Sequence, residues 1–342
     1  MSEKDQIQTF VILDLETNGL PREQFNKCAI TEISLYAIAA KCLINKDDYS
    51  RLFLRGASKE EVRFNAQPPD LPRVLNKITL MVRPGVPISS ISEKVTGLNN
   101  EMLENESPFD ESTANCINIF LERLKAPICL VAQNGWEHDY PIIRYVYEKL
   151  NKLFPSSIFC VDSLKAFREI DEKYNIINNA IHVMSMLEEK KEEPRTYDQT
   201  SDNGTKDLLD LLELNSQINW QKINETTPRK KRKETKEHYF NSLINEVISL
   251  KKTDEPSKKL RLKRALFTDD FTLSKYPAKG VYKLGNIYRR CFKQEPINLH
   301  RAEMDVEVLT KLILHYGIDF LAYAEERKQL FVEVPKLGSS TN

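Results

Sequence analysis

Apolar residues gather into short runs along the chain, and the first three runs predict β-strands. Residues 9–15 are rich in β-branched and other apolar side chains, and Asn18-Gly-Leu-Pro21 then breaks the pattern. Similar runs follow at residues 30–40 and 74–82, and the later run is followed by Pro84-Gly85. This order predicts three strands in a meander.

Further along the chain the apolar spacing alternates between helical and extended patterns. Apolar positions three and four apart predict a helix over residues 115–124, and a short buried strand follows at residues 128–132. Pro141 stands where the first residue of a helix is expected, residues 159–161 predict another strand, and a last helix starts near Ala302. The pattern predicts an α/β fold, in which a mixed five-stranded sheet is flanked by helices.

The composition then divides the chain into segments. Residues 176–275 are polar and highly charged, with no strand alternation, and we expect a largely disordered or mobile insertion there. The predicted organisation is one domain in two parts, which the insertion separates. The first part of the domain spans residues 1–175 and the second part spans residues 276–330. The insertion spans residues 176–275, and a C-terminal tail spans residues 331–342.

Charge and cysteine usage narrow the class of protein. The 50 basic and 50 acidic residues cancel, so any nucleic acid must be met by a local patch. The six cysteines are scattered without a CxxC pair, which fits a reducing compartment and argues against a zinc ribbon. The N-terminus does not resemble a secretory signal, and the most apolar long stretch, residues 308–324, is interrupted by Lys311, His315 and Asp319. We expect a soluble intracellular protein.

Two acids at the end of the first strand are the first candidates for chemistry. Asp14 and Glu16 stand two residues apart, so both carboxylates point to the same face of the sheet. Their repulsion would be relieved by a divalent cation, and oxygen ligands favour Mg²⁺ or Mn²⁺. The alternative is that Glu16 is merely exposed at a strand end while Asp14 makes a local turn contact.

Three later residues are candidates of the same kind. Asp139 lies between a predicted strand and a predicted helix, and Asp305 lies in the first turn of the last helix. Each could simply cap or begin a helix. His300 precedes the last helix on a loop, where a histidine is usually a cap or a surface residue. A loop is also where a mobile general base can approach a water molecule.

Together these residues resemble a known pattern. The chain resembles the DEDDh exonucleases of the RNase H-like fold, and within them the three-prime repair exonuclease group. The resemblance covers about residues 8–170 and 280–325, with order and spacing in agreement throughout. The segments that carry it are residues 10–21, 92–98, 129–135 with 139–141, 159–163, 282–288 and 300–305. Residues 92–98 resemble the family's substrate-side loop.

The resemblance implies a metal-dependent 3′→5′ exonuclease that releases 5′-mononucleotides from the 3′ ends of DNA, preferably single-stranded. It implies that two Mg²⁺ ions, for which Mn²⁺ can substitute, are held by four acids, with Asp14 bridging, while His300 deprotonates the attacking water. The implied metal ligands are Asp14, Glu16, Asp139 and Asp305. The implied substrate contacts are Glu16, Thr17, Leu20, Pro21, Val95 and His138. His138 and the preceding Trp136 and Glu137 depart from the family pattern, which usually has a tyrosine at position 138, and this puts the phosphate contact in doubt.

Two other functions stay open at this point. An RNA 3′ exonuclease would use the same carboxylates, since recognition of the 2′-hydroxyl is not visible in the sequence. A nucleic-acid-binding protein without activity is the alternative from another class, although the four acids and the histidine are all present.

The resemblance and the charge pattern also suggest partners and location. The family implies a homodimer, formed through the strand edge near residues 78–82, and a role in DNA degradation or repair. One branch of the family has a C-terminal hydrophobic tail that this sequence lacks, so we expect no membrane anchor. The basic clusters at residues 228–233 and 258–264 are typical of nuclear import or of phosphate-backbone binding, although they could also be solvated charge runs. We expect the nucleus, the cytoplasm or both.

Overall fold

The computed structural model describes most of the two predicted exonuclease segments and a small part of the region between them. The described residues are 6–21, 23–25, 27–44, 67–174, 256–267 and 280–338. The predicted cluster at residues 228–233 and most of the predicted insertion lie outside them.

The described strands form one mixed sheet in the order β3-β2-β1-β4-β5-β6. The strands are β1 (Thr9–Thr17), β2 (Ile30–Ala39), β3 (Asn76–Met81), β4 (Ile128–Ala132), β5 (Phe159–Asp162) and β6 (Gln329–Leu330). β1 pairs antiparallel with β2 and parallel with β4, and β5 continues the parallel part. This is the predicted RNase H-like fold, with three antiparallel strands followed by two parallel strands. The two-residue β6 adds a short sixth strand to the five predicted.

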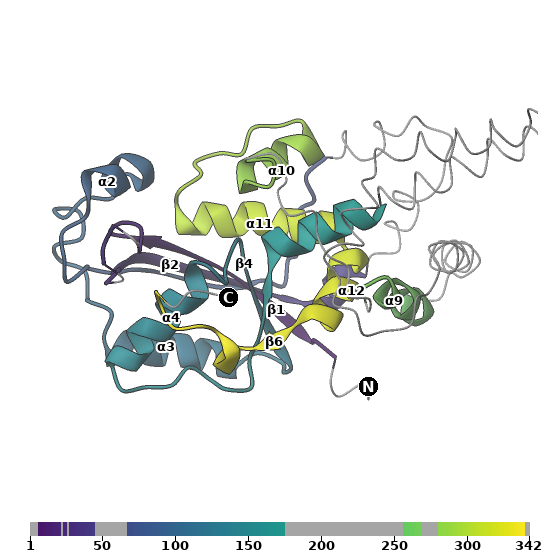
Figure 1. Cartoon of the computed structure of the whole chain (residues 1–342), viewed down its shortest axis with the longest axis horizontal. Helices are drawn as coiled ribbons and strands as arrows, with labels where there is room; N and C mark the ends of the chain where they lie inside the picture. The colour runs from purple at the N-terminus through teal and green to yellow at the C-terminus, as the bar shows by residue number, and fades with distance from the viewer. Residues whose placement is uncertain are drawn as a thin grey trace, which may run out of the picture.

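Helices cover both faces of this sheet (Figure 1). The described helices are α2 (Ser90–Thr96), α3 (Glu111–Glu122), α4 (Asp139–Lys149), helical residues 163–174, α9 (Pro256–Ala265), α10 (Leu284–Phe292), α11 (Ala302–Tyr316) and α12 (Ile318–Arg327), with short 3-10 helices at Ala40–Leu43 and Phe331–Glu333.

Alternation along β1 explains the two layers. Phe10 and Ile12 belong to the apolar core that also contains residues of α10, α11 and α12. Val11 and Leu13 belong to a second core with residues of α3 and α4. Because successive side chains of a strand point to opposite faces, one apolar strand supplies both cores.

Two segments differ from the prediction. Residues 92–98 were expected to form a loop, but most of them belong to α2, which Ser89 caps by accepting the backbone N–H of Ser92 and which ends at the left-handed Gly97. A serine before a helix and a glycine after it are the usual signals for such a short helix.

The second basic cluster also has a structure of its own. Residues 258–264 lie within α9, which packs against α12. Lys263 is buried, and its Nζ lies 2.5 Å from Oδ1 of Asp319, while Arg264 Nε lies 2.5 Å from Glu326. Part of this cluster is therefore neutralised by α12 instead of being a solvated charge run. Among the described residues, we find no helix long and apolar enough to cross a membrane.

Candidate active site

The two acids of β1 lie on one face of the sheet, as their spacing predicts. Asp14 and Glu16 are partly exposed, whereas Leu13 and Leu15 between and before them are buried in the α3–α4 core on the opposite face. The β1 backbone is fixed from both sides, by β2 and by β4. The two carboxylates are therefore presented by a rigid element.

Asp139 reaches the same region from the end of the neighbouring strand. β4 runs parallel to β1 and ends at Ala132, and Asp139 is the first residue of α4, with its side chain only 2% exposed. The carboxyl ends of parallel strands meet at one edge of a sheet, which brings Asp139 next to β1. Burial raises the pKa of Asp139, and the nearby backbone amide of Leu15 on β1 offsets part of that rise.

The loop between β4 and α4 has little room to move. A side chain at Gly135 would place its Cβ 2.7 Å from the Tyr140 ring and 2.8 Å from the Ala132 Cβ. The backbone N–H of Trp136 donates to Asp162 Oδ2 at 3.4 Å. Close packing and this bond fix the path that leads into Asp139.

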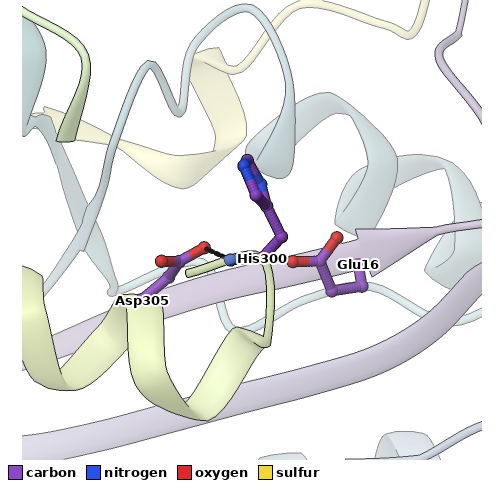
Figure 2. A group of neighbouring side chains, drawn as sticks. All are labelled: Glu16, His300 and Asp305. Carbon is purple, nitrogen blue, oxygen red and sulfur yellow. Dashed lines mark hydrogen bonds between the residues drawn. The ribbon is translucent and has the colours of Figure 1, made fainter. Parts of the chain in front are cut away.

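Asp305 and His300 come from the start of α11 and the loop before it. The His300 backbone N–H donates to Asp305 Oδ2 at 3.0 Å, and His300 has a φ of +69°, a conformation that non-glycine residues rarely adopt. One ligand atom each of Glu16, His300 and Asp305 can be chosen so that all three lie within 4.8 Å of one another. Figure 2 shows Glu16 and Asp305 on either side of His300.

Among the described residues, the compact ligand group contains Glu16, His300 and Asp305, and electrostatic interactions connect Asp14 and Asp139 to these acids. Burial raises the pKa of Asp14 well above its usual range, and the charges of Asp139 and Asp305 raise it further. Burial and then the charge of Asp305 raise the pKa of Glu16 to about 8. Burial also raises the pKa of Asp139 to about 8 and that of Asp305 to about 6. Four acids with raised pKa values cannot all be ionised cheaply without a compensating positive charge.

Two carboxylate oxygens are available for such a charge. Oδ1 of Asp139 and Oδ1 of Asp305 are buried, and neither has a hydrogen-bond partner among the described residues. A buried acceptor without a donor is costly, and a bound cation would satisfy it. Hard oxygen donors of this kind suit Mg²⁺ or Mn²⁺, so the residues present fit a divalent metal site.

The predicted substrate contacts lie around the end of β1. Leu20 and Val95 are exposed apolar side chains, at 58% and 48%. Ser92 of α2 donates its hydroxyl to the Thr17 carbonyl at 2.5 Å, so α2, which carries Val95, is bound to the β1 end from which Leu20 and Pro21 follow. His138 precedes α4, is partly buried, and has its pKa lowered by that burial.

One buried acid near the site was missed by the sequence analysis. Glu32 stands opposite Glu16 in the β1–β2 register and is 4% exposed. It lies inside an apolar run, and nothing in the local pattern marks it. Only the tertiary contact of β2 with α11, described below, gives it a role.

Comparison with known proteins places the chain in a family. It is 34% identical to three prime repair exonuclease 2 of Mus musculus over 179 residues, which are 51% of this chain and 67% of that protein. The identity is also 34% with three prime repair exonuclease 2 of Homo sapiens over 178 residues, with the same coverage. With three-prime repair exonuclease 1 of Bos taurus it is 34% over 168 residues, or 48% of this chain and 49% of the relative.

Solved structures are similar to this chain only at low sequence identity. No family model matches the chain. Among solved structures, cell-death related nuclease 4 has a TM-score of 0.32 at 12% identity and covers 71% of this chain and 64% of its own. An E. coli exonuclease I complex with single-stranded DNA has a TM-score of 0.32 at 12% identity and covers 47% and 29%. The identity to these relatives and the share of them that is covered show that this chain belongs to the three-prime repair exonuclease family of 3′→5′ exonucleases.

Proposed function

We propose that this chain is a divalent-metal-dependent 3′→5′ exodeoxyribonuclease that releases 5′-mononucleotides from single-stranded DNA ends. The observation that carries the proposal is the group of Glu16, His300 and Asp305, whose ligand atoms lie within 4.8 Å of one another, with Asp14 and Asp139 coupled electrostatically to these acids. Membership in a repair exonuclease family supports DNA as the substrate and repair or degradation of DNA as the role.

The proposed reaction depends on divalent metal ions held by the four acids. Two Mg²⁺ ions, for which Mn²⁺ can substitute, would supply Lewis-acid stabilisation of the attacking and leaving oxygens. Asp14, Glu16, Asp139 and Asp305 are the residues that would hold these ions. Such a charge would compensate the oxygens of Asp139 and Asp305 that have no hydrogen-bond partner among the described residues, and the raised pKa values of the four acids.

His300 is the proposed general base. It is exposed on a loop, so it can take a proton from a water molecule and then release it to solvent. The water oxygen bonds to the phosphorus of the terminal phosphodiester while the bond to the 3′ oxygen of the preceding nucleotide breaks. The leaving oxygen is protonated, and the terminal nucleotide departs with a 5′ phosphate.

The proposed substrate contacts account for low sequence specificity. Leu20, Pro21 and Val95 would pack against the terminal bases, while the backbone of Glu16 and Thr17 would approach the terminal sugar. Packing of apolar side chains against bases does not read hydrogen-bonding edges, so every base is accepted. His138 is the proposed phosphate contact from the α4 side, through a hydrogen bond from its ring.

Assembly and location complete the proposal. β3 is the edge of the sheet that the described strands form, and its outer side could pair with β3 of a second copy, which would give a homodimer through residues 78–82. A mass near twice 39.7 kDa by light scattering would support this. We propose the nucleus, the cytoplasm or both as the location, with import through residues 228–233.

The substrate is tested by direct competition between nucleic acids. Purified protein is incubated with Mg²⁺ and 5′-labelled single-stranded DNA, double-stranded DNA or RNA of the same sequence. We expect the highest kcat/KM on single-stranded DNA. A higher value on RNA would replace this proposal with a 3′ exoribonuclease, and binding without cleavage of any of them would favour an inactive nucleic-acid-binding protein.

A further inference from the structure

Glu32 receives no task in the proposed reaction, yet it is buried beside the site. Directly opposed residues of an antiparallel pair share a face, so Glu32 points to the same side of the sheet as Glu16. A buried carboxylate is costly unless hydrogen bonds compensate for it. Its Oε2 accepts the backbone N–H of Ala302 at 3.1 Å.

That bond meets a need of α11. The helix begins at Ala302, and Arg301 before it makes no side-chain capping bond. The first backbone N–H groups of a helix have no partner within the helix, and an acidic acceptor there is also favoured by the helix dipole. Glu32 therefore caps α11 from a strand that is remote in the sequence. Burial raises the pKa of Glu32, and the backbone N–H groups of Ala302 and Glu303 offset part of that rise.

A second set of contacts holds the same turn. The Glu303 carboxylate accepts the Tyr36 hydroxyl at 2.9 Å and Lys77 Nζ at 2.7 Å. Tyr36 lies on β2 and Lys77 on β3, so the first turn of α11 is attached to two strands of the sheet. Tyr36 and Lys77 are donors to the Glu303 carboxylate, so they hold this turn in place. The N–H of Ala302 needs an acceptor, which Glu32 supplies.

This turn carries the last two site residues. Asp305 belongs to it, and Asp305 in turn accepts the backbone N–H of His300, whose φ of +69° needs support from its surroundings. We propose that Glu32 is a positioning residue that caps α11 from β2 and so sets the places of Asp305 and His300. The proposal deepens the proposed function and rests on it for its kinetic part alone.

The test compares two substitutions that separate the capping oxygen from the negative charge. Glu32→Gln keeps a carbonyl oxygen that can accept the Ala302 N–H, whereas Glu32→Ala removes every acceptor. We expect Glu32→Ala to lower kcat about 10- to 100-fold, as loss of a residue that orients metal ligands commonly does, with little change in KM for single-stranded DNA. Glu32→Gln should recover most of that loss.

Hydrogen exchange gives a second readout that needs neither metal nor substrate. Amide protons over residues 300–305 should exchange faster in Glu32→Ala and at the wild-type rate in Glu32→Gln. Asp110→Ala is the matched control, because Asp110 caps α3 by accepting the Thr113 N–H at 2.9 Å, and α3 carries none of the proposed site residues. That variant should loosen α3 and leave kcat unchanged.

The outcomes separate a cap from a metal ligand. If Glu32→Gln is as inactive as Glu32→Ala while exchange stays at the wild-type rate, the charge and not the cap is required, and the proposal is overturned. Wild-type kcat in Glu32→Ala would also overturn it. Absence of DNA cleavage by the wild-type protein would instead defeat the proposed function, and the exchange experiment would still decide whether Glu32 caps α11.

Discussion

Replacing Asp139 by asparagine should stabilise the metal-free protein at alkaline pH. Burial raises the pKa of Asp139 from 3.8 to about 8, because the carboxylate is kept from water beside other acids. The folded protein therefore holds this proton more tightly than the unfolded chain does. Stability from this group is fully present below about pH 4 and is lost as the pH rises toward 8. Asparagine keeps a carbonyl acceptor but does not ionise, so the stability of the variant should not fall in this way as the pH rises.

The magnitude follows from the pKa shift. At pH 8 the shift corresponds to about 5 kcal/mol, at about 1.4 kcal/mol per pH unit. Because Asp14 and Asp139 interact strongly, a proton taken up by one relieves the other, so we expect a net gain of about 2 kcal/mol. In a protein of this size that is about 5 °C in Tm. Near pH 5 the gain should shrink to about a third.

Thermal unfolding followed by circular dichroism, in EDTA at pH 8 and pH 5, measures this gain. Asp110→Asn is the control, since Asp110 is a half-buried helix cap whose pKa is lowered by the Thr113 N–H, and its replacement should give no such rise. Mg²⁺ should then raise the Tm of the wild type more than that of Asp139→Asn. A lower Tm of Asp139→Asn at pH 8 in EDTA would refute the claim that these acids repel one another.

Three further changes probe other parts of the molecule. His300→Ala should lower kcat by about 10²- to 10⁴-fold with an unchanged circular dichroism spectrum, since the side chain is exposed, and retained turnover would remove it as the base. Lys263→Met should cost about 3–5 kcal/mol in urea unfolding, because the buried Asp319 carboxylate would lose its ammonium partner and keep the hydrogen bond from the Tyr174 hydroxyl; an unchanged midpoint would contradict the importance of this ion pair. Deleting residues 228–233 from a fluorescent fusion should reduce nuclear accumulation, and an unchanged distribution would exclude this cluster as an import signal.

Much of the fold could be predicted because its strands carry strong local patterns. Residues 9–15, 128–132 and 159–161 are apolar enough to predict buried strands, and β1, β4 and β5 form there. The strand β6 could not be predicted, since two residues are too few to show alternation. The helix near residue 302 was predicted without its end at Gly317, where the chain turns and begins α12.

The site residues divide in the same way. Asp14 and Glu16 could be found from strand alternation, and Asp139, His300 and Asp305 from their places at helix starts together with the family resemblance. Glu32 could not be found, because its partner lies 270 residues away along the chain. The burial of Lys263 could not be predicted either. A basic run has the same sequence pattern whether it is solvated or paired with an acid that is remote in the sequence, such as Asp319.

The metal requirement at the 3′ end is tested most directly with 5′-labelled single-stranded DNA. We expect the wild-type protein with Mg²⁺ to shorten the labelled strand from its 3′ end, one nucleotide at a time, and to release 5′-mononucleotides. EDTA should stop the reaction, added Mg²⁺ should restore it, and Asp14→Asn should be inactive under both conditions. Undiminished cleavage by Asp14→Asn, or by the wild type in EDTA, would contradict the conclusion that these carboxylates bind the catalytic ions.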